Sequence, residues 1–189
     1  MDVMEAMRQR HSYRSFTDEP VERGLLERVL NAARLAPSAM NSQPWRFHVA
    51  TGAKRDALIK TMQRTTVYLD DYLASMGQEE MIEDATAFAT NLGNAPVVIA
   101  VSVPREANEM AELNTLISAG AAIENLLLAA TAYGLATCSI TSSYWVRDQL
   151  SGVLAVRADE VVVALIVLGH GTGRPSAPVH EADIVVWHD

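Results

Sequence analysis

Basic side chains are concentrated near the N-terminus of a chain that is acidic overall. Three arginines lie in the first 14 residues, although the formal net charge is −8. The cluster consists of Arg8, Arg10, His11, Ser12 and Arg14. A guanidinium group forms paired hydrogen bonds with phosphate oxygens, and a serine hydroxyl adds a neutral donor. The arginine segment, RHSYRSF at residues 10–16, therefore predicts a phosphate-binding site, and the alternative is a solvated basic face without a ligand.

A second polar segment follows, which we call the polar loop, APSAMNSQPW at residues 36–45. Hydrogen-bonding side chains occupy four of its positions: Ser38, Asn41, Ser42 and Gln43. Pro37 ends the preceding helical pattern, since its ring removes a backbone donor and restricts the residue before it. The loop has the composition of one that holds a flat polar ligand. The alternative is an ordinary turn that precedes a buried Trp45.

Regular elements are predicted on both sides of these two segments. A first helix is expected over about residues 2–11, and a second over residues 20–36, with Thr17 or Asp18 as its N-cap. Residues 46–50 alternate as a short strand does. The arginine segment and the polar loop thus each connect a helix to the next element.

The remaining chain alternates between buried strands and helices, which predicts the α+β class. Residues 51–91 are polar, acidic and rich in Met, and they are helical in type. β-Branched and apolar runs predict strands at 94–103, 135–141 and 161–169, and an Ala- and Leu-rich run predicts a buried helix at 113–133, ended by Gly134. Residues 182–188 alternate, and we expect an edge strand there that reaches a partner subunit.

Composition excludes several classes of function. The chain has 189 residues, 49% of them hydrophobic, and shows no linker, so we expect a single domain over residues 1–189. A pI near 5.1 argues against a nucleic-acid-binding surface, which needs a basic face. The single Cys138 excludes an internal disulfide framework and a cysteine-rich metal site, and its apolar neighbours predict a buried structural thiol.

Targeting signals are not expected. The first ten residues carry acids and no long apolar run, unlike a signal peptide. We count no stretch of about 18 apolar residues, the length that a membrane-spanning helix needs. The predicted location is therefore the cytoplasm, with no membrane partner.

The two polar segments, in this order, resemble the nitroreductase family of flavin-dependent oxidoreductases. GAAIENLLLAATAYGLATCSIT (residues 120–141) resembles the central helix of the family and the strand that follows it. ALIVLGHGTGRP (residues 164–175) resembles its last core strand and the next turn. The resemblance covers nearly the whole chain apart from roughly residues 51–95. It implies a nitroreductase-like fold, in which helices flank a central, mainly antiparallel sheet, and an intertwined homodimer with FMN at its interface.

The resemblance also implies which residues contact FMN. Arg10 corresponds to the ribityl and ring-edge position and Arg14 to the phosphate position, while His11 and Ser12 lie between them. Pro37, Ser38, Ala39 and Asn41 correspond to the loop that packs on the flavin from the other subunit. Thr141 and Ser142 occupy the stretch beside flavin N5, where many members have glycine instead of Ser142, and Arg174 would complete the phosphate site. No metal ligand and no acid or base residue is expected.

The implied reaction is a two-step hydride transfer. NADH or NADPH would reduce FMN, and an electron-poor small molecule such as a nitroaromatic or a quinone would then be reduced in the same pocket, with ping-pong kinetics. Alternatives within this fold are substrate dehydrogenation, flavin fragmentation and a non-catalytic flavin-holding role. A deazaflavin in place of FMN and the choice of nucleotide stay open. A serine hydrolase is rejected, because adjacent His11 and Ser12 rarely face each other and GxSxG is absent.

Overall fold

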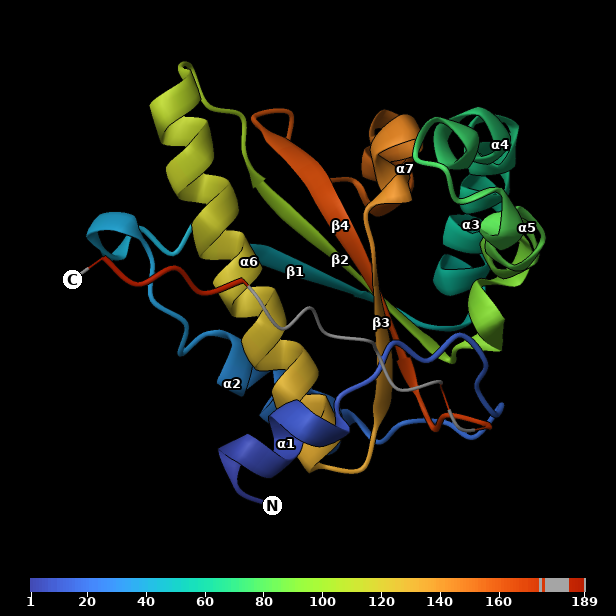
Figure 1. Cartoon of the computed structure of the whole chain (residues 1–189), viewed down its shortest axis with the longest axis horizontal. Helices are drawn as coiled ribbons and strands as arrows, with labels where there is room; N and C mark the ends of the chain where they lie inside the picture. Colours follow the sequence, from blue (N-terminus) through green and yellow to red (C-terminus); the bar gives the residue numbers. More distant parts are fainter. Residues whose placement is uncertain (174, 176–183, 189) are drawn as a thin grey trace.

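A computed structural model of the chain describes residues 1–173, 175 and 184–188 (Figure 1). Its described part contains one sheet, made of β1 (Arg46–Ala50), β2 (Val97–Pro104), β3 (Ala136–Ile140) and β4 (Glu160–Gly169). The strands lie in the order β1-β2-β4-β3, and every neighbouring pair is antiparallel. The expected α+β class with a mainly antiparallel central sheet is confirmed.

Helices cover both faces of this sheet (Figure 1). On one face α2 (Arg23–Ala33) packs against α6 (Glu109–Ala132), and α1 (Val3–Gln9) contacts α6. The other face carries α3 (Gly52–Met62) and α7 (Arg147–Leu154), with α5 (Ile82–Asn91) against α3 and α4 (Thr66–Ser75) against α5. Short 3-10 helices connect these elements: η1 (Ala39–Asn41), η2 (Gln63–Thr65), η3 (Glu79–Met81), η4 (Leu92–Asn94) and η5 (Ser142–Val146).

β2 forms the centre of two apolar clusters. Successive residues of a strand point to opposite faces, so a run that is apolar throughout must be covered on both sides. Ile99 packs with Leu126 of α6 on one face, whereas Val98 packs with Leu58 of α3 on the other. The helices of both faces are thereby fixed relative to one sheet.

α6 passes a length and composition test for a membrane-spanning helix, with a mean hydropathy of 1.4 over 18 residues. The expectation that no such stretch exists is therefore wrong by this measure. The reason is that α6 packs against α2, β2 and β3, which requires apolar residues on more than one side. Its contacts with the sheet make it a core helix.

The predicted start of the second helix is also wrong. α2 begins at Arg23, and Glu22 occupies the N-cap position without a side-chain cap. Thr17 instead donates its backbone N–H to the His170 carbonyl at 2.8 Å. Thr17 is therefore held beside the end of β4 and does not cap the helix, which begins six residues later.

The predicted C-terminal strand is not present in residues 184–188, which form no strand within the chain. Ile184, Val185, Val186 and Trp187 are all exposed there. Pairing of this segment with a partner subunit stays a prediction. The outer edge of β1 pairs with no strand in the described ranges, so it is available for such pairing.

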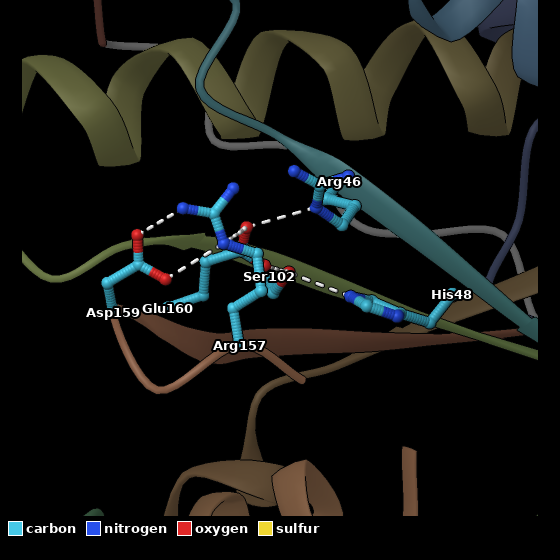
Figure 2. A network of polar contacts seen from close by, with 6 residues as sticks. All are labelled: Arg46, His48, Ser102, Arg157, Asp159 and Glu160. Carbon is cyan, nitrogen blue, oxygen red and sulfur yellow. Dashed lines mark hydrogen bonds and ion pairs between the residues drawn. The ribbon is translucent and has the colours of Figure 1, made fainter. Parts of the chain in front are cut away.

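A polar network joins the ends of β1, β2 and β4 (Figure 2). The Ser102 hydroxyl donates to Glu160 Oε2 at 2.7 Å, and Arg46 Nε pairs with Glu160 Oε1 at 3.0 Å. Because Ser102 donates to the carboxylate, it accepts from His48 Nε2 at 2.9 Å, which assigns the proton to that ring nitrogen. Burial lowers the pKa of His48 and favours its neutral form. The buried Glu160 carboxylate thus has a partner for each of its oxygens, Ser102 for one and Arg46 for the other.

Candidate functional site

The arginine segment leaves α1 and crosses the edge of the sheet. Tyr13 donates its backbone N–H to the Thr137 carbonyl of β3 at 2.9 Å. Phe16, which is buried in the core, donates to the Gly93 carbonyl at 2.9 Å. These two anchors hold the intervening residues in an extended course between β3 and η4.

A third anchor comes from the chain after β4. Thr172 donates its backbone N–H to the Ser15 carbonyl at 2.9 Å and its hydroxyl to Ser15 Oγ at 2.7 Å. Gly171 is in contact with the Tyr13 ring, and a Cβ at this position would overlap that ring. The backbone of the segment is thus fixed by residues far away in the sequence, which is a preorganised arrangement for its side chains.

These anchors leave a pocket of about 710 Å³ beside the segment, which we call the arginine pocket. Four predicted site residues line it together: Arg10, His11, Ser12 and Arg14. The volume lies in the range of about 300–1,000 Å³ that is typical of small-molecule sites. The structure therefore brings these four predicted residues together at one concave site.

The two arginines of the pocket have different surroundings. Arg10 Nε lies 3.5 Å from Glu124 of α6. Arg14 forms no ion pair with any carboxylate in the described part of the chain, and its side chain is exposed to the pocket. The Arg14 guanidinium is therefore free to pair with an anionic ligand.

Cys138 lies beneath the pocket on β3. It is buried, as predicted, and burial raises the pKa of its thiol, while Arg14, Ser12 and Arg10 act in the opposite direction. The thiol is neutral near pH 7 because burial has the largest effect. Cys138 therefore packs under the site as an unreactive group.

The opposite wall of the arginine pocket comes from α5, which sequence reasoning did not identify. Its lining residues are Asp84, Ala87, Phe88 and Asn91. Their spacing of i, i+3, i+4 and i+7 places them on one face of the helix. The wall is polar at both ends and apolar in the middle, which suits a flat ring beside Phe88. This spacing was the available sequence signal.

The polar loop does not line the arginine pocket within one chain. Ser38 closes the loop on itself, since Ser38 Oγ accepts a hydrogen bond from the Gln43 backbone N–H at 2.9 Å. The Gln43 side chain donates to Asn41 Oδ1 at 3.2 Å, which leaves the Asn41 amide donors for a ligand. Ala39 tethers the loop to α6 through a backbone hydrogen bond to Ser118 Oγ at 3.2 Å. Gln43 therefore contacts both Ser38 and Asn41 and holds the loop in shape.

Backbone strain marks the same loop. Met40, Asn41 and Gln43 have φ values of 52°, 55° and 46°, a left-handed conformation that residues other than glycine rarely adopt. Met40 is also 95% exposed. Such conformations persist where the surrounding structure enforces them and are concentrated at binding sites. A polar loop that is strained and exposed is more consistent with a binding element than with a simple turn.

Thr141 and Ser142 follow β3 but do not line the arginine pocket. Thr141 accepts the Tyr144 backbone N–H at 2.9 Å, and Ser142 begins η5 without a positive φ. No glycine is needed for this backbone, so the absence of the usual glycine does not disturb the loop. Arg174 lies outside the described residues, although Gly173 and Pro175 line the pocket.

Comparison with known proteins decides the family. The model of the nitroreductase family matches residues 7–170 of this chain. The chain belongs to the nitroreductase family. The matched range of this nitroreductase family member includes the arginine segment, the polar loop and every strand of the sheet.

Individual relatives agree with the family match. The nitroreductase family member is 30% identical over 197 residues to the 4-nitrobenzoate reductase of Nocardioides sp. (strain LMS-CY), covering 87% of this chain and 78% of that protein. It is 27% identical over 206 residues to the nitrobenzene nitroreductase of Ectopseudomonas oleovorans, covering 88% and 86%. The FMN and NADPH-dependent nitroreductase NfnB of Sphigopyxis sp. strain HMH matches in structure with a TM-score of 0.82 at 22% identity, over all of both chains. The nitroreductase-like fold is confirmed.

Proposed function

We propose that this protein is an FMN-dependent oxidoreductase that uses NADH or NADPH to reduce electron-poor acceptors such as nitroaromatics or quinones. The observation that carries the proposal is the arginine pocket, in which Arg10, Ser12 and Arg14 face the partly apolar wall of α5. Membership of the nitroreductase family supports the reaction class.

The donors of the pocket fit FMN. A phosphate dianion needs cations, and Arg14 has no carboxylate partner among the described residues. The ribityl hydroxyls need polar neighbours, which Ser12 and His11 supply. The flavin ring needs an apolar surface, and Ala87 and Phe88 offer one. The residues present thus match each part of the group.

Bound FMN would supply the hydride chemistry, and the protein would bind and orient both substrates. Arg14 would hold the phosphate and Arg10 the ribityl and ring edge, where its positive charge favours the reduced, anionic ring. Only Arg10 Nε pairs with Glu124, at 3.5 Å, so the two terminal nitrogens of the guanidinium would contact the cofactor while Glu124 limits the movement of Arg10.

We propose a homodimer in which the polar loop of one subunit completes the arginine pocket of the other. The loop is strained, presents the Asn41 amide donors, and lies outside the pocket of its own chain. α6 supports the same proposal, because one part of it exposes an apolar stripe: Met110, Leu113, Leu116 and Ile117. Such a surface marks a protein interface. The exposed segment at residues 184–188 is the candidate strand for pairing with the free edge of the partner's β1.

The names of the relatives support nitroaromatic acceptors, since one is a 4-nitrobenzoate reductase and another a nitrobenzene nitroreductase. Substrate dehydrogenation, flavin fragmentation and flavin holding remain the competing functions for the same fold. A single domain over residues 1–189 and a cytoplasmic location also stay predictions.

An anaerobic titration separates these functions. The purified protein is loaded with FMN, mixed with NADPH or NADH without oxygen, and followed by its flavin absorbance. Bleaching by either nucleotide, followed by reoxidation with a quinone or nitrobenzene, is expected. Bound flavin that neither nucleotide bleaches would contradict a reductase and favour a holding role.

A further inference from the structure

The arginine pocket has a direction that α5 defines. Gly93, just beyond the C-terminal end of α5, is in contact with the Arg14 backbone, so this end of the helix lies beside the proposed phosphate position. Asp84 lies seven residues before Asn91 on the same helical face. A rise of 1.5 Å per residue puts about 10 Å between their positions along the helix. Asp84 is therefore at the end of the pocket away from the phosphate.

The charge at that end is negative. Asp84 is the carboxylate in the described lining of the pocket, and it lies in the first turn of α5. No Lys, Arg or His occurs in the sequence between Arg64 and Arg105, so no cation from this stretch of chain compensates it. The two arginines of the lining belong to the other wall. An acceptor that enters opposite the phosphate therefore meets a carboxylate.

We propose that Asp84 is a specificity-determining residue, which selects neutral and cationic acceptors over anionic ones. This inference rests on the proposed function. Two acceptors of different charge illustrate the expected preference. Nitrobenzene is neutral, whereas 4-nitrobenzoate carries a carboxylate that Asp84 repels. The positive charges of Arg10 and Arg14 do not cancel this effect, since the dianionic phosphate of the cofactor balances two guanidinium charges.

The test compares three nitroaromatics of different charge in Asp84→Asn. We measure kcat/KM for nitrobenzene, 4-nitrobenzoate and 4-nitrobenzyltrimethylammonium, because in ping-pong kinetics this ratio does not depend on the nucleotide half-reaction. Removal of one nearby charge should raise kcat/KM for 4-nitrobenzoate, relative to that for nitrobenzene, by roughly three- to tenfold. It should lower kcat/KM for the cationic compound by a similar factor. Asp84→Glu keeps the charge and should keep the wild-type preference.

Glu83→Gln is the matched control, since it removes the same charge one residue earlier, on a different face of α5 outside the pocket lining. A binding measurement complements the kinetics. Benzoate and benzyltrimethylammonium are not reduced, and their Kd values for the oxidised FMN-loaded protein are read from flavin absorbance. Asp84→Asn should lower the Kd of benzoate and raise the Kd of benzyltrimethylammonium.

The outcomes separate the inference from the function on which it rests. If nitrobenzene is reduced but the charge preference is the same in wild type and Asp84→Asn, the inference is overturned and the reductase stands. An equal shift in Glu83→Gln would show a general charge effect and would also overturn it. Failure to bind FMN or to accept hydride from either nucleotide overturns the proposed function, and the inference with it.

Discussion

The backbone of Gly93 lies directly against the main chain of Arg14, so that a Cβ on Gly93 would overlap the Arg14 carbonyl. Gly93 also has a φ of +64°, which glycine adopts without strain. Two requirements thus meet at one residue, a left-handed backbone and a close approach. Together they position the arginine that faces the pocket.

Gly93→Ala should destabilise the protein by about 2–4 kcal/mol, because strain in the backbone adds to the steric overlap. FMN affinity should fall as well, since Arg14 must move. Urea denaturation and flavin fluorescence measure the two effects. Gly77→Ala is the control, because Gly77 has a φ of +65° with no atom within 4 Å of its Cβ position. It should cost about 1 kcal/mol. An equal loss of unfolding free energy in both variants would show that the overlap with Arg14 contributes nothing.

Arg14→Gln should weaken FMN by roughly 10- to 100-fold, the usual effect of losing a hydrogen bond to a charged group. Riboflavin lacks the phosphate, and its affinity should change little. Arg23→Gln, which alters a 91% exposed arginine of α2, should affect neither ligand. A parallel loss of riboflavin affinity would place Arg14 at the ring instead of the phosphate.

Asn41→Asp should weaken FMN by roughly three- to tenfold, because the carboxylate keeps the shape of the side chain but lacks the amide donors. Aspartate tolerates the left-handed backbone at Asn41 better than alanine does. Fluorescence titration gives the Kd. An unchanged Kd would remove the polar loop from the proposed site.

Ile117→Glu should prevent dimerisation, because Ile117 is 64% exposed on α6 and a charge there would be buried by a partner. Analytical ultracentrifugation should show monomers, and FMN affinity should fall with the dimer. Met76→Glu introduces the same charge at another exposed apolar residue and should leave both unchanged. A monomer that still binds FMN with full affinity would refute a shared site.

Glu160→Gln should destabilise the protein by about 1–3 kcal/mol at pH 7. Burial alone raises the pKa of Glu160, but the Ser102 hydrogen bond and Arg46 outweigh it and lower the pKa below 4.5. The wild-type stabilisation is therefore present above pH 4.5 and is lost as the pH falls through the folded pKa. Chemical denaturation at several pH values should show the two proteins converge in acid. Glu79→Gln, an exposed control, should follow the wild type.

β2 and β4 were predictable because burial on both faces leaves a continuous apolar run in the sequence. β2 and β4 begin and end within three residues of the predicted limits. The order β1-β2-β4-β3 was not predictable, because it depends on pairing between segments that α6 and α7 separate. Local signals also misplaced the start of α2, since Thr17 is held by His170, a contact that no sequence pattern reveals.

The site divides in the same way. Arg10, Ser12 and Arg14 are neighbours in sequence, and their types alone indicated a phosphate-binding site. The spacing of Ala87 and Phe88 marks one face of a helix, but the same spacing is typical of an ordinary apolar helix face, and only the fold places α5 opposite the arginines. The polar loop lies apart from the pocket, because its proposed role requires a second chain.

The three anchors of the arginine segment have a consequence for biosynthesis. Tyr13 forms a backbone hydrogen bond with Thr137, and Ser15 forms one with Thr172. The partners of both residues are therefore synthesised more than 120 residues later. Contacts of such sequence separation form late in folding, because a long loop must close first. The ribosome must therefore release the chain beyond Thr172 before the pocket exists, and flavin uptake during expression should report completed folding instead of nascent structure.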